Sequence, residues 1–245
     1  MLRTRLLTAI VLIPIVAWII YLGNLPFLGL IGLLTTLAEV ELTTLIAGRS
    51  IRLVDLFGVC LVWLFVLDSA FPQWGLLTWG LAGTLLLSLS WQVLHYQGAT
   101  VQDWTGVIAS GVYVGLCGSF LIRLRALPGD GLWWTFIAIP VTLFADSAAY
   151  IVGSLWGRHK LAPQLSSGKT LEGHAAGVLA SAVMGTFLGW AWGLKAGPGS
   201  SVSWFHGLIL SVLIAAVAPM GDLAISMVKR EAGVKDSGKL LPGHG

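Results

Sequence analysis

The chain has 245 residues, of which 56% are hydrophobic and only 10% are charged, and its formal net charge is +3. A soluble domain carries about a quarter charged residues, so this chain lacks the polar surface that a soluble domain needs. The same numbers exclude a disordered chain, a disulfide scaffold and a collagen-like fibre. They leave a protein that crosses a membrane several times, provided that the apolar residues come in runs of about 20.

Eight such runs follow one another along the chain, each bounded by charge, Gly or Pro. They cover residues 6–22, 25–47, 53–71, 74–96, 106–122, 132–155, 174–194 and 204–228. We interpret the first as an uncleaved span because no small-x-small cleavage site follows it. The expected fold is therefore all-α, a polytopic transmembrane helix bundle with about eight spans.

The Lys and Arg residues in the loops predict the orientation of this bundle. With the N-terminus in the cytoplasm, only Arg123, Arg125 and Lys195 fall outside. The residues that then fall inside are Arg3, Arg5, Arg49, Arg52, Arg158, Lys160, Lys169, Lys229, Arg230, Lys235 and Lys239. Scattered in this way among spans, the cations do not indicate a nucleic-acid partner.

Polar residues divide the chain into two regions. Residues 1–125 are expected to form N-terminal transmembrane helices with little chemistry. Residues 126–245 are expected to form a catalytic transmembrane region, with a cytoplasmic loop at 156–173 and a polar C-terminal segment at 222–245.

Several carboxylates fall within the predicted spans, where a charge is costly, and two of them are candidates for function. Asp146 lies among small residues midway along one run, and a structural carboxylate bonded to a neighbouring helix is its alternative interpretation. Asp222 follows Pro219, where a helix is expected to kink or break. It shares a helix face with Ser226, and an acid and a hydroxyl close to cations suit a metal-bridged phosphate. A helix end with its charges at the membrane surface is the alternative here.

The cytoplasmic loop combines hydroxyls, a lysine and the start of a helix. Gly168-Lys169-Thr170 has the ending of a P-loop, but Pro163 occupies the position where that motif needs its first Gly. An anion would still suit Ser166, Lys169 and Thr170 near a helix N-terminus. Glu172 lies where the helix dipole favours a carboxylate.

The C-terminal segment 226–245 follows the last span directly and is rich in cations, so attraction to anionic lipid is its plain interpretation. The order of its residues points elsewhere, because it closely resembles the signature of the phosphatidate cytidylyltransferases. The matching positions are Ser226, Val228, Lys229, Arg230, Lys235, Asp236, Gly238, Leu241, Pro242, His244 and Gly245. A second block agrees, with Asp146, Tyr150, Gly153, Gly157, Lys160, Pro163, Ser166, Lys169, Glu172 and Gly173 in the family's pattern.

The resemblance implies a reaction in which phosphatidate attacks the α-phosphorus of CTP, giving CDP-diacylglycerol and pyrophosphate. Catalysis of such a transfer is mostly positioning and charge neutralisation by cations and metal. The residues expected to act in catalysis are Lys169, Ser226, Lys229, Arg230, Lys235 and His244. Those expected to bind substrate are Ser166, Thr170, Glu172 and Asp146, and those expected to hold Mg²⁺ or another divalent cation are Asp222 and Asp236.

The resemblance also implies a setting for the enzyme. It is expected to be an integral protein of a bacterial-type inner membrane with its active site facing the cytoplasm. Its partners would be CTP, phosphatidate and the lipid bilayer, without nucleic acid, and a second copy of the chain is a candidate partner.

The family pattern continues beyond the position of Gly245, with a further Gly, an Asp-Arg-x-Asp segment and usually another span. The expectation is therefore a truncated member that lacks a ninth span and at least one metal-holding acid. Whether the 245 residues alone are active is open at this point.

Two other functions compete with this interpretation. A membrane kinase for polyprenol or phytol would use CTP but release CDP instead of pyrophosphate. A transporter would use Asp146 and Asp222 as an ion path, but its polar residues should then open to both faces of the membrane, whereas here they gather on one.

Overall fold

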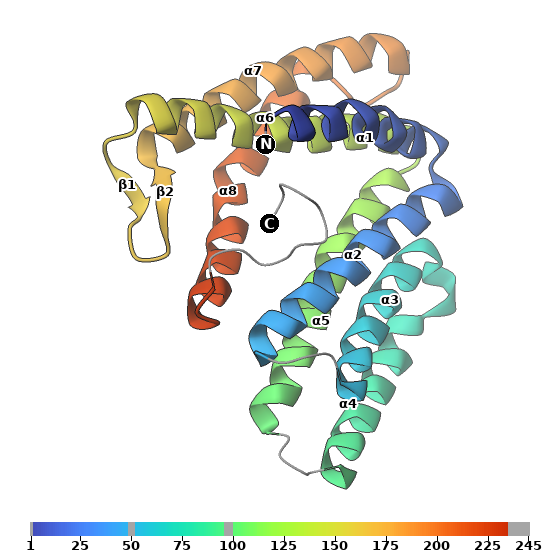
Figure 1. Ribbon diagram of the computed structural model, residues 1–245. Helices are drawn as coiled ribbons and strands as arrows, with labels where there is room; N and C mark the ends of the chain where they lie inside the picture. Colours follow the sequence, from blue (N-terminus) through green and yellow to red (C-terminus); the bar gives the residue numbers. More distant parts are fainter. Residues whose placement is uncertain (1, 49–51, 96–99, 235–245) are drawn as a thin grey trace. The chain divides into compact units, whose positions relative to one another are not determined.

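The computed structural model describes residues 2–48, 52–95 and 100–234, with side chains from Leu12 onward, and it is almost entirely helical (Figure 1). The helices are α1 (Leu2–Leu22), α2 (Asn24–Ala47), α3 (Leu56–Ala70), α4 (Leu76–Leu94), α5 (Val101–Arg125), α6 (Gly131–Trp156), α7 (Leu171–Ala196) and α8 (Trp204–Glu231). Two short strands, β1 (Lys160–Ala162) and β2 (Ser166–Thr170), stand between α6 and α7.

Seven helices in the described part of the chain, α2 to α8, are long and apolar enough to cross a membrane. Helix α3 reaches this length together with the single helical turn before it, as Leu53–Ala70. In α1 the described apolar stretch is shorter, Leu12–Leu22. The predicted all-α polytopic bundle is therefore confirmed.

The helices form two compact units, the first up to Ala126 and the second over Leu127–Arg230. In the first unit, α2, α3 and α5 pack against one another, and Leu61, Val62 and Val66 of α3 are fully buried. Small residues let the backbones approach, as membrane helices commonly do. A Cβ atom on Gly111 would lie 2.8 Å from the Gly58 carbonyl oxygen.

The two arginines at the end of α5, which the charge pattern placed outside, have partners within the first unit. The Arg123 guanidinium lies 3.6 Å from the Asp68 carboxylate, and its Nε donates to the Ser69 hydroxyl at 3.2 Å. Arg125 donates to the last carbonyls of α1, from Nε to Ile20 at 2.8 Å and from Nη2 to Tyr21 at 3.1 Å. These bonds satisfy carbonyls that a helix end leaves without intrahelical partners.

The second unit consists of α6, the hairpin, α7 and α8. Its core contains Ile137, Val141 and Val202, against which several Trp and Leu side chains pack. Helices α6 and α7 lie side by side (Figure 1), and α7 meets α8 where a Cβ atom on Gly207 would collide with the Gly185 carbonyl. Both contacts depend on residues without bulky side chains, so the three helix backbones are held close together.

Three local predictions differ from the structure. The loop at 156–173 contains an antiparallel hairpin in which Lys160 lies opposite Thr170. Helix α8 runs from Trp204 to Glu231 through Pro219, so of the expected kink or break the break does not occur. Helix α5 begins five residues before the predicted apolar run because Thr100 and Asp103 form a capping box there, and a capped polar turn adds no apolar residues.

Candidate active site

One cavity of about 700 Å³ lies in the second unit, at the end of α6 that continues into the hairpin. Helix α6 presents one face to it, since Asp146, Tyr150, Gly153 and Gly157 recur at helical spacing. The full lining is Asp146, Ala149, Tyr150, Gly153, Ser154, Gly157, Lys160, Leu161, Ser166, Gly168, Lys169, Thr170, His174, Pro219 and Asp222. The cavity therefore draws on α6, both strands, the start of α7 and the middle of α8.

Thr170 fixes the junction between the hairpin and α7. Its hydroxyl accepts the Gly173 amide at 3.1 Å, so Thr170 is the N-cap of α7 and is almost fully buried. A Cβ atom on Gly153 or Gly173 would lie 2.9 Å from this hydroxyl oxygen. The glycines at these two positions let α6 and α7 close around the cap.

Lys169 and Asp222 form an ion pair across the cavity. The ammonium nitrogen of Lys169 on β2 donates to the Asp222 carboxylate on α8 at 2.6 Å. The Asp222 side chain is 60% exposed, so solutes can reach this pair. Asp146 lines the same cavity from α6. Residues expected to hold phosphate and to hold metal thus meet in one place.

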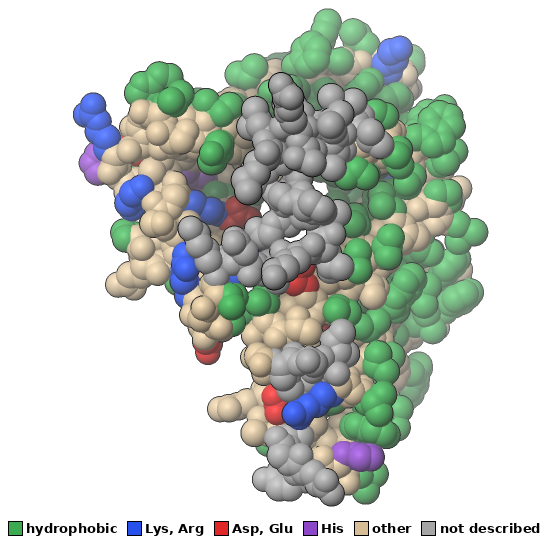
Figure 2. All heavy atoms as spheres, viewed as in Figure 1, with side chains coloured by type: hydrophobic (Ala, Val, Ile, Leu, Met, Phe, Trp, Pro, Cys, Tyr) green, Lys and Arg blue, Asp and Glu red, His purple; other side chains and the backbone are tan. Residues whose placement is uncertain are grey.

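The last turns of α8 bring further predicted residues to this end of the unit. The Ser226 hydroxyl donates to the Asp222 carbonyl one turn earlier, at 2.7 Å. The Arg230 Nε donates to the Leu165 carbonyl in the hairpin at 3.3 Å, which ties the hairpin to α8. Lys229 stands in the last turn of the same helix. Figure 2 shows Lys and Arg side chains gathered over the hairpin and the end of α8, in contrast to the green apolar surface of the helices.

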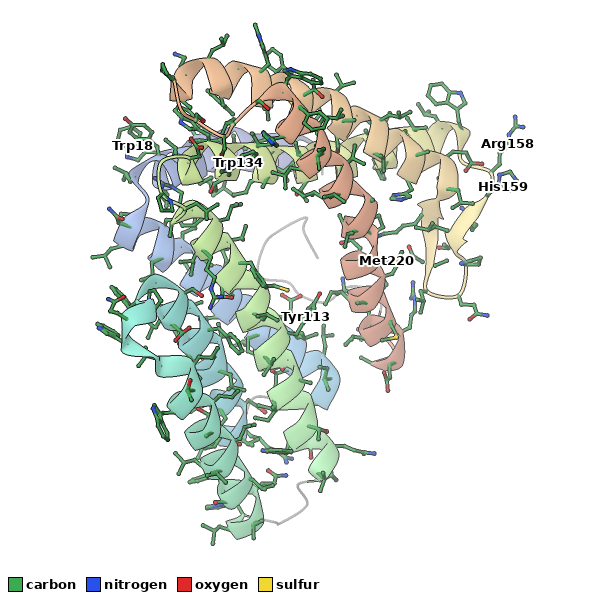
Figure 3. The ribbon with its side chains drawn as sticks, turned by 180° about the vertical axis from the view of Figure 1, so that it is seen from behind. Trp18, Tyr113, Trp134, Arg158, His159 and Met220 are labelled. Carbon is green, nitrogen blue, oxygen red and sulfur yellow. The ribbon has the colours of Figure 1, made fainter. Side chains whose placement is uncertain are left out.

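Glu172 points to the chain before the hairpin. Its carboxylate bonds the His159 ring at 2.6 Å and accepts the backbone amides of Arg158 and His159. Figure 3 shows Arg158 and His159 where α6 passes into the hairpin. Among the described residues that line the cavity, neither Glu172 nor His159 is found.

Three of the predicted site residues, Lys235, Asp236 and His244, lie outside the described residues. The structure also places Lys160 and His174 at the cavity; Lys160 matched the family pattern without an assigned role, and His174 has no place in that pattern. The hairpin register explains Lys160, because pairing with Thr170 brings it to the cavity. His174 lies one turn after the N-cap Thr170 on α7. This spacing puts it on the same side of the helix start as Thr170, and it could have been recognised from the sequence.

The residues present fit a divalent cation bound jointly with phosphates. Mg²⁺ usually takes one or two carboxylates and completes its shell with water and substrate phosphates. Asp146 and Asp222 supply two carboxylates to one cavity. Within the described residues, no group of three or more His, Cys, Asp or Glu side chains could form an all-protein cage.

Buried small-residue helix contacts and an open cavity lined by carboxylates, lysines and hydroxyls define a polytopic membrane protein with one strongly polar cavity. Comparison with known proteins narrows the class of protein further. The family described as "Cytidylyltransferase family" matches residues 3–245. The chain belongs to this family.

Relatives in several bacteria are named phosphatidate cytidylyltransferase. The protein of Bacillus subtilis (strain 168) is 31% identical over 99% of this chain and 90% of its own length. That of Brucella suis biovar 1 is 37% identical over 100% of this chain and 86% of its own length. That of Staphylococcus haemolyticus is 29% identical over 99% of this chain and 91% of its own length.

Proposed function

We propose that this protein is a phosphatidate cytidylyltransferase that converts CTP and phosphatidate to CDP-diacylglycerol and pyrophosphate. The observation that supports this most directly is the cavity of the second unit. It combines Lys169, Asp222 and Asp146 in a chain that belongs to the cytidylyltransferase family. The relatives' names supply the lipid substrate.

The proposed reaction is a displacement at the α-phosphorus of CTP. A phosphate oxygen of phosphatidate forms the new P–O bond, and the bond to the departing pyrophosphate breaks. Little covalent chemistry is left for the protein, so charge and position supply the catalysis. Lys160 and Lys169 bring positive charge to the cavity from the hairpin, and Ser166 offers a hydroxyl to a phosphate oxygen.

We propose Mg²⁺ or a similar divalent cation as the cofactor, held by Asp222 with Asp146 beside it. When bound, such an ion would neutralise negative charge on the phosphates. Lys169 now pairs with Asp222, and its ammonium would turn to the phosphates when the carboxylate takes the cation. Asp236 is proposed as a further metal ligand, and Lys229, Arg230, Lys235, Ser226 and His244 as further contacts to substrate.

We propose the cytoplasmic face of a bacterial inner membrane as the location of this site. The Lys and Arg residues of the hairpin and the α8 end support it, because loops with excess positive charge stay in the cytoplasm. A site at the membrane surface also suits the substrate, whose phosphate lies at the interface while its acyl chains stay in lipid.

The test is the release of pyrophosphate from CTP by the full-length protein in vesicles with and without phosphatidate. Asp222→Asn removes one charged ligand and should lower the rate at least about 100-fold, since lost electrostatic stabilisation of a transition state typically costs this much. Glu41→Gln removes a carboxylate from α2 in the other unit and should leave the rate unchanged.

Two results would contradict the proposal. Full activity of Asp222→Asn would remove the metal assignment. Release of CDP instead of pyrophosphate would show a kinase that transfers the γ-phosphoryl group.

A further inference from the structure

The carboxylate of Glu172 has a set of bonds that neither metal binding nor substrate binding explains. Oε1 lies 2.6 Å from Nδ1 of His159 and accepts the His159 amide at 3.1 Å. Oε2 accepts the Arg158 amide at 3.1 Å. Both oxygens are therefore engaged by the segment that leads out of α6, 13 and 14 residues earlier in the chain.

This contact closes the base of the hairpin. The Leu171 amide donates to the His159 carbonyl at 2.9 Å, next to the Glu172 bonds. Thr170 already caps α7, so Glu172 is not needed for that task. Its bonds join the two ends of the hairpin to each other.

The hairpin between these ends presents the cations of the cavity. Lys160 is the first residue of β1, directly after His159, and Lys169 lies on β2, three residues before Glu172. Both line the cavity. The orientation of these two lysines therefore depends on how firmly the base of a short two-strand sheet is held, and an isolated hairpin is marginally stable in water.

We propose that Glu172, together with His159, is a positioning residue that holds the hairpin base so that Lys160 and Lys169 face the substrate phosphates. This inference rests on the proposed function. Glu172 itself does not touch substrate, and its effect passes through the two lysines.

We call the bonds from Glu172 to Arg158 and His159 the pin of the hairpin. Loss of this pin should weaken nucleotide binding more than it slows turnover. A freed hairpin samples arrangements in which the lysines point elsewhere, and the apparent affinity falls with the fraction of molecules that remain competent. Once CTP is bound, the phosphates hold the lysines in place. Glu172→Ala should therefore raise the KM for CTP roughly 5- to 20-fold while kcat changes less than about twofold.

The experiment compares Glu172→Ala, Glu172→Gln and His159→Ala in the full-length protein in phosphatidate vesicles, with Glu41→Gln as the control. Gln keeps an oxygen acceptor for the backbone amides, so the KM for CTP of Glu172→Gln should lie close to that of the unaltered protein. His159→Ala should give an intermediate KM, and Glu41→Gln the KM of the unaltered protein. The thermal unfolding midpoint should stay close to that of the unaltered protein, because the lost bonds join only the ends of the hairpin and leave the core around Ile137 and Val141 intact.

Three results would overturn the inference. An unchanged KM in Glu172→Ala means that the lysines do not need the pin. A collapse of kcat that Gln fails to rescue means direct contact with the reacting groups. A lowered unfolding midpoint with fewer active molecules and an unchanged KM means a merely structural role.

Hydrogen exchange separates this inference from the proposed function. In the absence of nucleotide, the amides of Arg158 and His159 should exchange at least several-fold faster in Glu172→Ala, and unchanged exchange would overturn the pin by itself. If the unaltered protein shows this protection but makes no CDP-diacylglycerol, the proposed function fails. The role of Glu172 at the hairpin base would then stand, but its role in positioning the lysines for substrate would not.

Discussion

Single polar side chains in this protein join segments that are distant in sequence. Asp130, just before α6, is an example in the second unit. One carboxylate oxygen accepts the Ser200 hydroxyl, and the other accepts the hydroxyl and the amide of Ser201, all at 2.7 Å. These bonds hold the connection between α7 and α8 against the start of α6.

The same bonds predict a pH dependence of stability. The hydroxyls of Ser200 and Ser201 and the Ser201 amide lower the pKa of Asp130 below its usual value. A carboxyl whose pKa is lower in the folded state stabilises the fold above its unfolded pKa, and this contribution is lost as the pH falls through the folded pKa. Asp130→Asn should therefore lower the thermal unfolding midpoint at pH 7.

The measurement is the midpoint of Asp130→Asn and of the unaltered protein from pH 7 to pH 3. The difference between the two should begin to shrink as the pH falls below the unfolded pKa of Asp130, because its contribution is lost as the pH approaches and passes the lower folded pKa. A difference that stays constant over this range would show that the charge of Asp130 does not contribute.

At the scale of helices, α7 and α8 approach each other through glycine. Gly207 lies against the Gly185 carbonyl, and Ser211 one turn later is fully buried. Side chains at this contact would separate the helices, and the cavity residue Asp222 lies on α8 three turns beyond. The packing of these helices therefore helps to place the carboxylate.

Gly207→Ala tests this packing. The added methyl group would collide with the Gly185 backbone, and overpacking costs about 1–3 kcal/mol. We expect the thermal unfolding midpoint of Gly207→Ala to fall by several degrees. Gly83→Ala adds the same methyl group to α4, where nothing lies within 4 Å, and it should leave the midpoint unchanged or raise it slightly. Equal behaviour of the two variants would contradict the close contact.

The sequence predicted these helices because long apolar runs have few alternatives in a membrane, where backbone groups must bond within the helix. It did not predict the hairpin, because β1 and β2 are short. Their Ser, Gly and Lys residues also suit a loop. It brought Asp146, Lys169 and Asp222 together only through the family resemblance. The pairing of Glu172 with His159 depends on how the chain turns between them, which spacing alone does not determine.

At the scale of the whole molecule, the charge pattern predicts which side of the membrane each loop occupies. Residue 168 lies in the hairpin and residue 198 in the connection between α7 and α8, and a single span separates them. They should therefore face opposite sides, with 168 in the cytoplasm.

Single cysteines at these positions test the prediction in cells. Cys60 and Cys117 are both free and exposed, so they must first be replaced by Ala. An impermeant thiol reagent added from outside should then modify Pro198→Cys and leave Gly168→Cys unmodified until the membrane is opened. If only Gly168→Cys were modified from outside, the predicted orientation would be wrong and the opposite one would hold.

The bonds from Arg125 to the end of α1 have a consequence for synthesis. The carbonyl of Ile20 is made 105 residues before the guanidinium that bonds it. At about 5–20 residues per second, the ribosome needs about 5–20 s to reach that arginine. During this interval the end of the first helix must rely on water or lipid headgroups. The first unit can therefore acquire its final hydrogen bonds only after its fifth helix has entered the membrane.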